Sequence, residues 1–82
     1  MKKETLTITN VHISPEEISH LCEKLSKLDC RIYIEVENQR INGKSVMGML
    51  SFRVEKGRPI QVLAEGKEES AAISMIKGLF AK

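Results

Sequence analysis

The sequence predicts an α+β protein in which a mostly antiparallel sheet is covered on one face by helices. Segments with alternating apolar residues, typical of half-buried strands, are interleaved with segments whose apolar residues recur at helical spacing. The repeated strand, helix and strand units that a parallel sheet requires do not occur. The 82 residues are enough for one modest core and too few for two, so we expect residues 1–82 to form a single domain.

The first strand is expected at Thr5–Thr9, where apolar and polar residues alternate. A loop begins at Asn10 and leads to a strong helix start. Ser14 is expected at the N-cap, Pro15 occupies the first helical position, and Glu17 stands three residues after the serine, which completes a capping box. The following apolar residues share one helical face: Ile18, Leu21, Cys22, Leu25 and Leu28.

The rest of the chain returns to alternation before it ends in a helix. Arg31–Val36 is expected to be a strand, and residues 37–38 turn it into a short strand that ends near Ile41. The fourth strand is expected at Ile60–Glu65. The last helix has acidic residues in its first turn and one apolar face: Ala72, Ile73, Ile76, Leu79 and Phe80.

Composition argues against several classes of function. The net charge of +2 comes from interspersed acidic and basic residues, and Trp is absent, so a nucleic-acid partner is not expected. No apolar segment has the length of a membrane span or the pattern of a signal peptide, which makes a cytoplasmic location the default. Cys22 and Cys30 lack the spacing of a zinc site and are expected to be reduced. We expect no metal, no cofactor and no catalysis by the chain itself.

Residues 42–50 have the least ordinary composition in the chain. Turn formers are followed by Ser45 and by apolar residues that are too few and too interrupted by glycine for a long helix. One interpretation places Ser45 at the N-terminus of one or two helical turns, where an added phosphate would be stabilised by backbone N–H groups and partial positive charge. The competing interpretation is that Ser45 is only an N-cap.

The apolar side chains of this segment also allow two interpretations. Met49 and Phe52 are expected to fill the space between the short helix and the sheet. A short helix cannot bury every side, so Val46, Met47 and Leu50 are candidates for an exposed docking patch beside a modifiable serine.

The segment Asn42 to Ser51, read Asn-Gly-Lys-Ser-Val-Met-Gly-Met-Leu-Ser, resembles the regulatory-serine segment of HPr, the small phosphocarrier of the bacterial sugar phosphotransferase system. The resemblance extends to further positions: Gly57, Ile60 to Ala64, Gly66, Glu68, Glu69 and Ala72. It implies an open-faced β-sandwich of four strands with three helices. It also implies that the patch at Val46, Met47 and Leu50 contacts enzyme I, a sugar permease, the HPr kinase or a catabolite repressor.

The resemblance is weakest in residues 10–20, where the family carries the motif Gly-[Leu/Ile]-His-x-Arg-Pro with the histidine at the N-cap of the first helix. Without a gap, Ser14 falls on the active histidine, Glu16 on the arginine and Glu17 on the proline. Matching His12-Ile13-Ser14-Pro15 to His-x-Arg-Pro instead inserts two residues into the helix, which rotates its buried face by about 200°. We therefore favour the ungapped alignment, in which the phosphoryl acceptor is lost.

The resemblance and the residues together predict an HPr-like regulatory or adaptor protein with Ser45 as its candidate phosphorylation site. The alternative is a working phosphocarrier in which His12 accepts the phosphoryl group from enzyme I. The competing interpretation of His12 is an ordinary loop histidine, and His20 is expected to be a partly exposed structural residue of the first helix.

Overall fold

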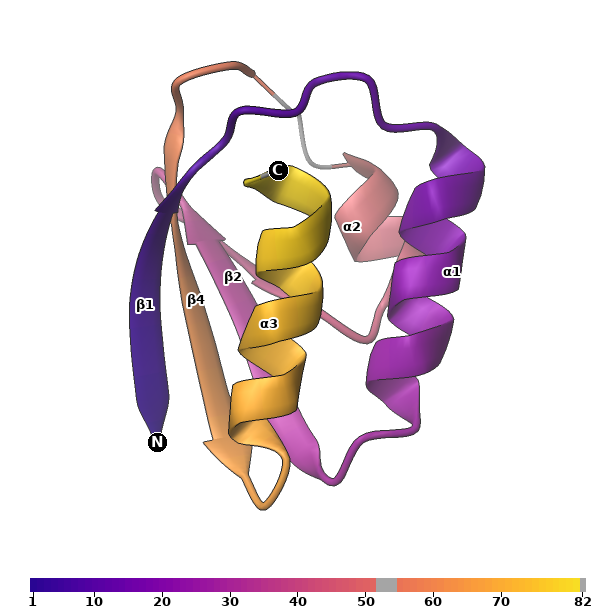
Figure 1. Ribbon diagram of the computed structural model, residues 1–82, viewed down its shortest axis with the longest axis vertical. Coiled ribbons are helices and arrows are strands. Elements are labelled where there is room, and N and C mark those ends of the chain that lie inside the picture. The colour runs from indigo at the N-terminus through magenta and orange to yellow at the C-terminus, as the bar shows by residue number, and fades with distance from the viewer. Residues whose placement is uncertain (52–54, 82) are drawn as a thin grey trace.

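The computed structural model describes residues 1–51 and 55–81 (Figure 1). Its secondary structure alternates strands and helices along the chain. In chain order the elements are β1 (Lys2–Thr7), α1 (Pro15–Ser26), β2 (Cys30–Val36), β3 (Gln39–Asn42), α2 (Val46–Ser51), β4 (Pro59–Gly66) and α3 (Glu69–Phe80).

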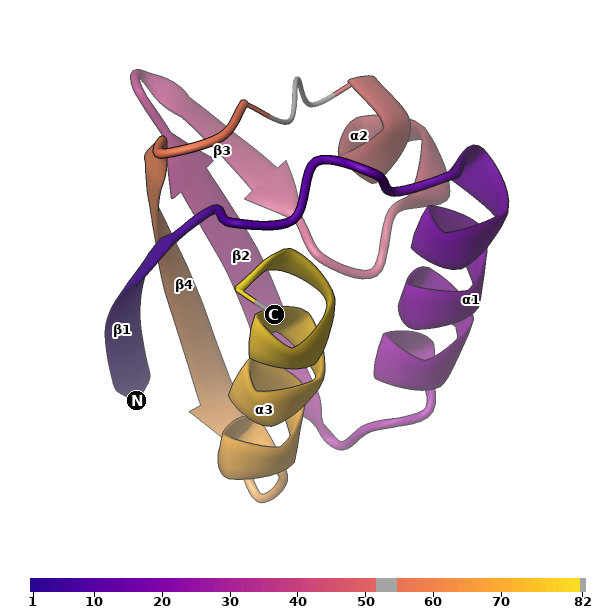
Figure 2. The ribbon, with the colours of Figure 1, turned by 45° about the horizontal axis from the view of Figure 1, so that its top comes forward.

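The four strands form one sheet in the order β1-β4-β2-β3, and all three neighbouring pairs are antiparallel. The three helices lie together on one face of this sheet, as the views in Figures 1 and 2 show. The predicted fold class, an α+β open-faced sandwich, is therefore confirmed.

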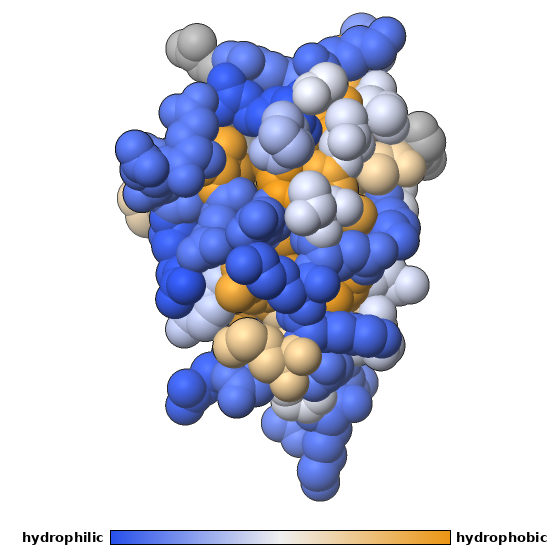
Figure 3. All heavy atoms as spheres, turned by 90° about the vertical axis from the view of Figure 1, so that its left-hand side faces the viewer, coloured by the Kyte–Doolittle hydropathy of each residue, from blue (hydrophilic) through white to orange (hydrophobic). Residues whose placement is uncertain are grey.

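The core lies between the sheet and the helices. Alternate residues of the strands point into it, and each long helix contributes the face that its apolar spacing predicts. The side of the molecule away from the helices, seen in Figure 3, is covered largely by hydrophilic side chains with apolar atoms visible between them. The largest fully buried side chains include Phe80, Ile8, Leu25, Ile32, Ile34 and Met49.

Three predictions about the elements need correction or fall outside the described residues. β1 begins at Lys2 and ends at Thr7, because the amides of Thr9 and Asn10 donate to the Phe80 carbonyl at the end of α3 and not to β4. Leu28 is only half-buried, because α1 ends two residues before it. The predicted packing of Phe52 lies outside the described residues.

Candidate functional site

Ser45 stands on a short, closely held loop between β3 and α2. The Asn42 side chain accepts from the Lys44 amide at 2.9 Å, and the Asn42 carbonyl accepts from the Ser45 amide at 3.0 Å. Gly43 is buried and donates its N–H to the Ile32 carbonyl at 2.8 Å. The backbone that carries Ser45 is thus fixed to β2.

The Ser45 side chain acts as an N-cap for α2. Its Oγ accepts from the Gly48 amide at 3.2 Å, and its carbonyl accepts from the Met49 amide at 3.0 Å. The residue is partly exposed, so the hydroxyl has a role in the helix start and also lies at the surface.

The apolar residues of α2 divide into one buried anchor and three exposed side chains. Met49 is 1% exposed and belongs to the core, whereas Met47 is 83% exposed, Leu50 45% and Val46 38%. Because α2 packs against α1 and β3, its remaining sides face solvent. The structure therefore places Ser45 next to the exposed residues of the six-residue helix α2. We call the three exposed apolar side chains, Val46, Met47 and Leu50, the α2 patch.

The first turn of α1 is closed by its own residues. Ser14 is the N-cap with extended backbone, its Oγ accepts from the Glu17 amide at 3.2 Å, and the Glu17 carboxylate accepts from the Ser14 amide at 3.2 Å. Pro15 has no N–H to offer. Glu16 and Glu17 both add negative charge at this helix end, where an anion would otherwise be attracted.

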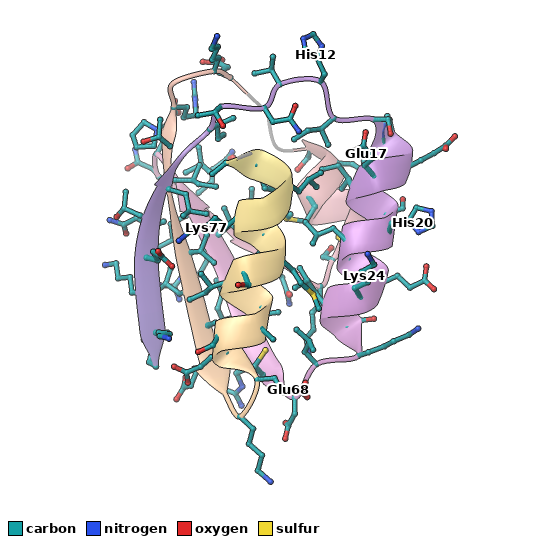
Figure 4. The ribbon with its side chains drawn as sticks, in the orientation of Figure 1. His12, Glu17, His20, Lys24, Glu68 and Lys77 are labelled. Carbon is teal, nitrogen blue, oxygen red and sulfur yellow. The ribbon has the colours of Figure 1, made fainter. Side chains whose placement is uncertain are left out.

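His12 lies in the loop before this helix, and its side chain is exposed. Figure 4 shows its ring pointing away from α1 at the top of the molecule. The loop is held by Asn10, whose side-chain Nδ2 donates to the Leu79 carbonyl at 2.9 Å and whose Oδ1 accepts from the His12 amide at 3.2 Å. The α3 terminus thus fixes where the His12 loop runs.

His20 is an exposed residue of α1. Its ring points outward from α1 in Figure 4, because position 20 falls outside the helical face formed by Leu21 and Ile18.

Lys44 has a contact that local sequence patterns do not predict. Its Nζ donates to the Leu28 carbonyl at 2.9 Å, two residues beyond the end of α1, so it connects the Ser45 loop to α1. Nothing in the local sequence indicates this contact, because the two residues are 16 positions apart. The exposure of Val11 was not predicted either: this apolar residue next to His12 is 37% exposed. Its position in a loop was a signal for such exposure.

The cysteines are free and buried. Burial raises the pKa of the Cys22 thiol, and burial also raises the pKa of Cys30, against the opposing effect of the nearby Lys44 ammonium. Among the residues described, no group of three or more His, Cys, Asp or Glu side chains is placed to hold a metal ion. In the same part of the chain, no helix has the length and apolar character needed to cross a membrane.

A small open-faced sandwich presents the Ser45 hydroxyl at the start of a short helix, with exposed apolar side chains beside it.

Comparison with known proteins gives the family. The family profile described as "PTS HPr component phosphorylation site" matches residues 2–82. The phosphocarrier protein HPr of Treponema pallidum (strain Nichols) is 30% identical over 83 residues, which cover 98% of this chain and 92% of that protein. This chain belongs to the HPr family of the phosphotransferase system.

Two solved structures have the same fold over nearly the whole chain. HPr-C-His from Thermoanaerobacter tengcongensis is 31% identical with a TM-score of 0.80, over 99% of this chain and 92% of that one. The histidine-containing phosphocarrier protein from Mycoplasma is 27% identical with a TM-score of 0.79, over 99% of this chain and 100% of that one.

Proposed function

We propose that this HPr-family chain is a regulatory or adaptor protein of the phosphotransferase system, switched by phosphorylation of Ser45, and that it does not carry a phosphoryl group on histidine. The observation that supports this most strongly is the closed first turn of α1. Ser14 and Glu17 satisfy each other there, and the His12 ring points away from that turn. A phosphohistidine carrier needs an imidazole held over free amides at such a helix end.

The proposed modification is a phosphoryl transfer from a nucleoside triphosphate, catalysed by a kinase of the HPr-kinase type. A bond forms between Ser45 Oγ and the γ-phosphorus. The bond between that phosphorus and the oxygen bridging the β- and γ-phosphates breaks, and the nucleoside diphosphate leaves. The hydroxyl proton passes to a base of the kinase. The partial exposure of Ser45 supports access of a kinase to its hydroxyl. We also propose a cytoplasmic location, where a nucleotide donor is present.

The phosphate would act on the neighbouring surface through its charge. Phosphoserine carries about −2 charges near pH 7, and the α2 patch begins at the next residue. We propose that this charge changes which protein of the phosphotransferase system, or of its regulation, binds Val46, Met47 and Leu50. Glu16 stands where the family has an arginine in the ungapped alignment, so partners that combine phosphoserine with that arginine are expected to bind weakly.

Treatment with HPr kinase and ATP tests this proposal. We expect acid-stable phosphate at one equivalent in the wild-type chain and none in Ser45→Ala, measured by intact mass and by label retained after acid. Ser51→Ala is the matched control, because Ser51 is an exposed serine in the same helix and its loss should leave the label unchanged. Acid-stable label that persists in Ser45→Ala, or no label in any variant, would contradict the proposed switch.

His12 remains the second candidate because its exposed ring is accessible to a phosphoryl donor. It would serve as the acceptor from enzyme I in a functional phosphocarrier.

A further inference from the structure

The Lys44 side chain connects the Ser45 loop to the C-terminal end of α1. Its ammonium donates to the Leu28 carbonyl at 2.9 Å in a partly buried position. This carbonyl follows the last turn of α1, in which the Leu28 amide donates to the Leu25 carbonyl at 3.1 Å. A cation at this place stabilises the end of the helix, because carbonyl groups there carry partial negative charge.

The partner of this ammonium is a neutral carbonyl. No carboxylate among the described residues lies within ion-pair distance of Lys44, although Asp29 and Glu65 line the same surface hollow of about 460 Å³. A hydrogen bond between two charged groups is stronger than one from a charged donor to a neutral acceptor. A dianion placed next in sequence would therefore compete well for this ammonium.

The backbone around Lys44 is held while its side chain is long and flexible. The amides of Gly43, Lys44 and Ser45 donate to Ile32, the Asn42 side chain and the Asn42 carbonyl respectively. A change at Ser45 can therefore move the lysine side chain without moving the loop. The Lys44 side chain can therefore occupy two positions, one at the end of α1 and one at a phosphate on Ser45.

We propose that a phosphate on Ser45 draws the Lys44 ammonium away from the Leu28 carbonyl, so that the state of Ser45 is transmitted to the C-terminal end of α1. This inference rests on the proposed modification of Ser45 and adds a regulatory consequence at a second place in the fold. In the unmodified chain Lys44 stabilises the last turn of α1, and in the modified chain it neutralises part of the phosphate charge and leaves that turn weaker.

The test compares four proteins by NMR, with the ¹³C shift of the Leu28 carbonyl as the readout. They are the wild type, Lys44→Met, the chain with phosphoserine incorporated at position 45 during synthesis, and the combination of both changes. We expect phosphoserine to shift the Leu28 carbonyl in the same direction as Lys44→Met, because each removes the same hydrogen bond. In the combined protein, phosphoserine should add no further shift.

Lys27→Met is the matched control, because Lys27 is an exposed lysine at the same helix end. The side-chain donor to the Leu28 carbonyl is Lys44, so this substitution should leave that hydrogen bond in place. Phosphoserine should still shift the carbonyl in that variant. If Lys44→Met loses the native amide spectrum, Lys44→Gln takes its place. A Leu28 carbonyl that does not respond to phosphoserine, or that responds equally without Lys44, would overturn the proposal. Direct incorporation makes this result independent of whether a kinase modifies Ser45.

Discussion

Replacing Met49 by alanine is expected to lower the free energy of unfolding by about 2–5 kcal/mol, the usual cost of truncating a buried methionine. Met49 is 1% exposed and is the buried residue of α2. A helix of six residues has little stability of its own, so its attachment depends on this anchor. Urea denaturation followed by circular dichroism measures the change.

Met47→Ala is the control for this prediction, because it removes the same atoms from the same helix. Met47 is 83% exposed, and its loss should change the free energy of unfolding by no more than about 0.5 kcal/mol. Equal effects of the two substitutions would show that α2 is not anchored as described. A strong loss in Met47→Ala alone would mean that the α2 patch is buried.

Replacing Gly66 by alanine is expected to destabilise the fold by about 2–5 kcal/mol, through backbone strain and overpacking together. Gly66 has φ of 145°, a conformation that L side chains rarely adopt. An added Cβ would lie 2.6 Å from both the Asp29 carbonyl oxygen and the Cys30 Cα, which are backbone atoms and cannot simply rotate away. The collision falls where Gly66, the last residue of β4, pairs with Cys30, the first residue of β2.

Gly57→Ala separates the two causes. Gly57 also has positive φ, at 84°, but an added Cβ would meet nothing within 4 Å. Gly57→Ala should therefore lower the free energy of unfolding only through backbone strain, by about 1 kcal/mol. Thermal or urea unfolding of both variants decides the matter: if Gly57→Ala destabilises as much as Gly66→Ala, the close approach at Asp29 does not contribute.

Much of the fold was predictable because local signals agreed with tertiary packing. The capping box at Ser14 fixed the start of α1, and alternation in β2 separated inward from outward residues. The patch of Val46, Met47 and Leu50 was also predictable in kind, since a six-residue helix has too little contact area to cover all its side chains.

Contacts between distant segments were not predictable from local patterns. The C-terminal end of β1 depends on α3, because the Phe80 carbonyl accepts the amides of Thr9 and Asn10 that follow the strand. The hydrogen bond from Lys44 to the Leu28 carbonyl likewise joins residues 16 positions apart. The hydrogen bond from Asn10 to the Leu79 carbonyl joins residues 69 positions apart. Periodicity and capping rules describe neighbours in sequence, so these side chains carried no signal of their partners.

Ser14, and not an imidazole, occupies the start of α1, and our proposal that the chain lacks a histidine acceptor depends on this position. Incubation with enzyme I and phosphoenolpyruvate tests it most directly, with the HPr of Treponema pallidum as a reference labelled in parallel. We predict no acid-labile phosphate on this chain above the level found in His12→Gln. Acid-labile phosphate at one equivalent in the wild type, lost in His12→Gln, would contradict the account and establish His12 as the acceptor.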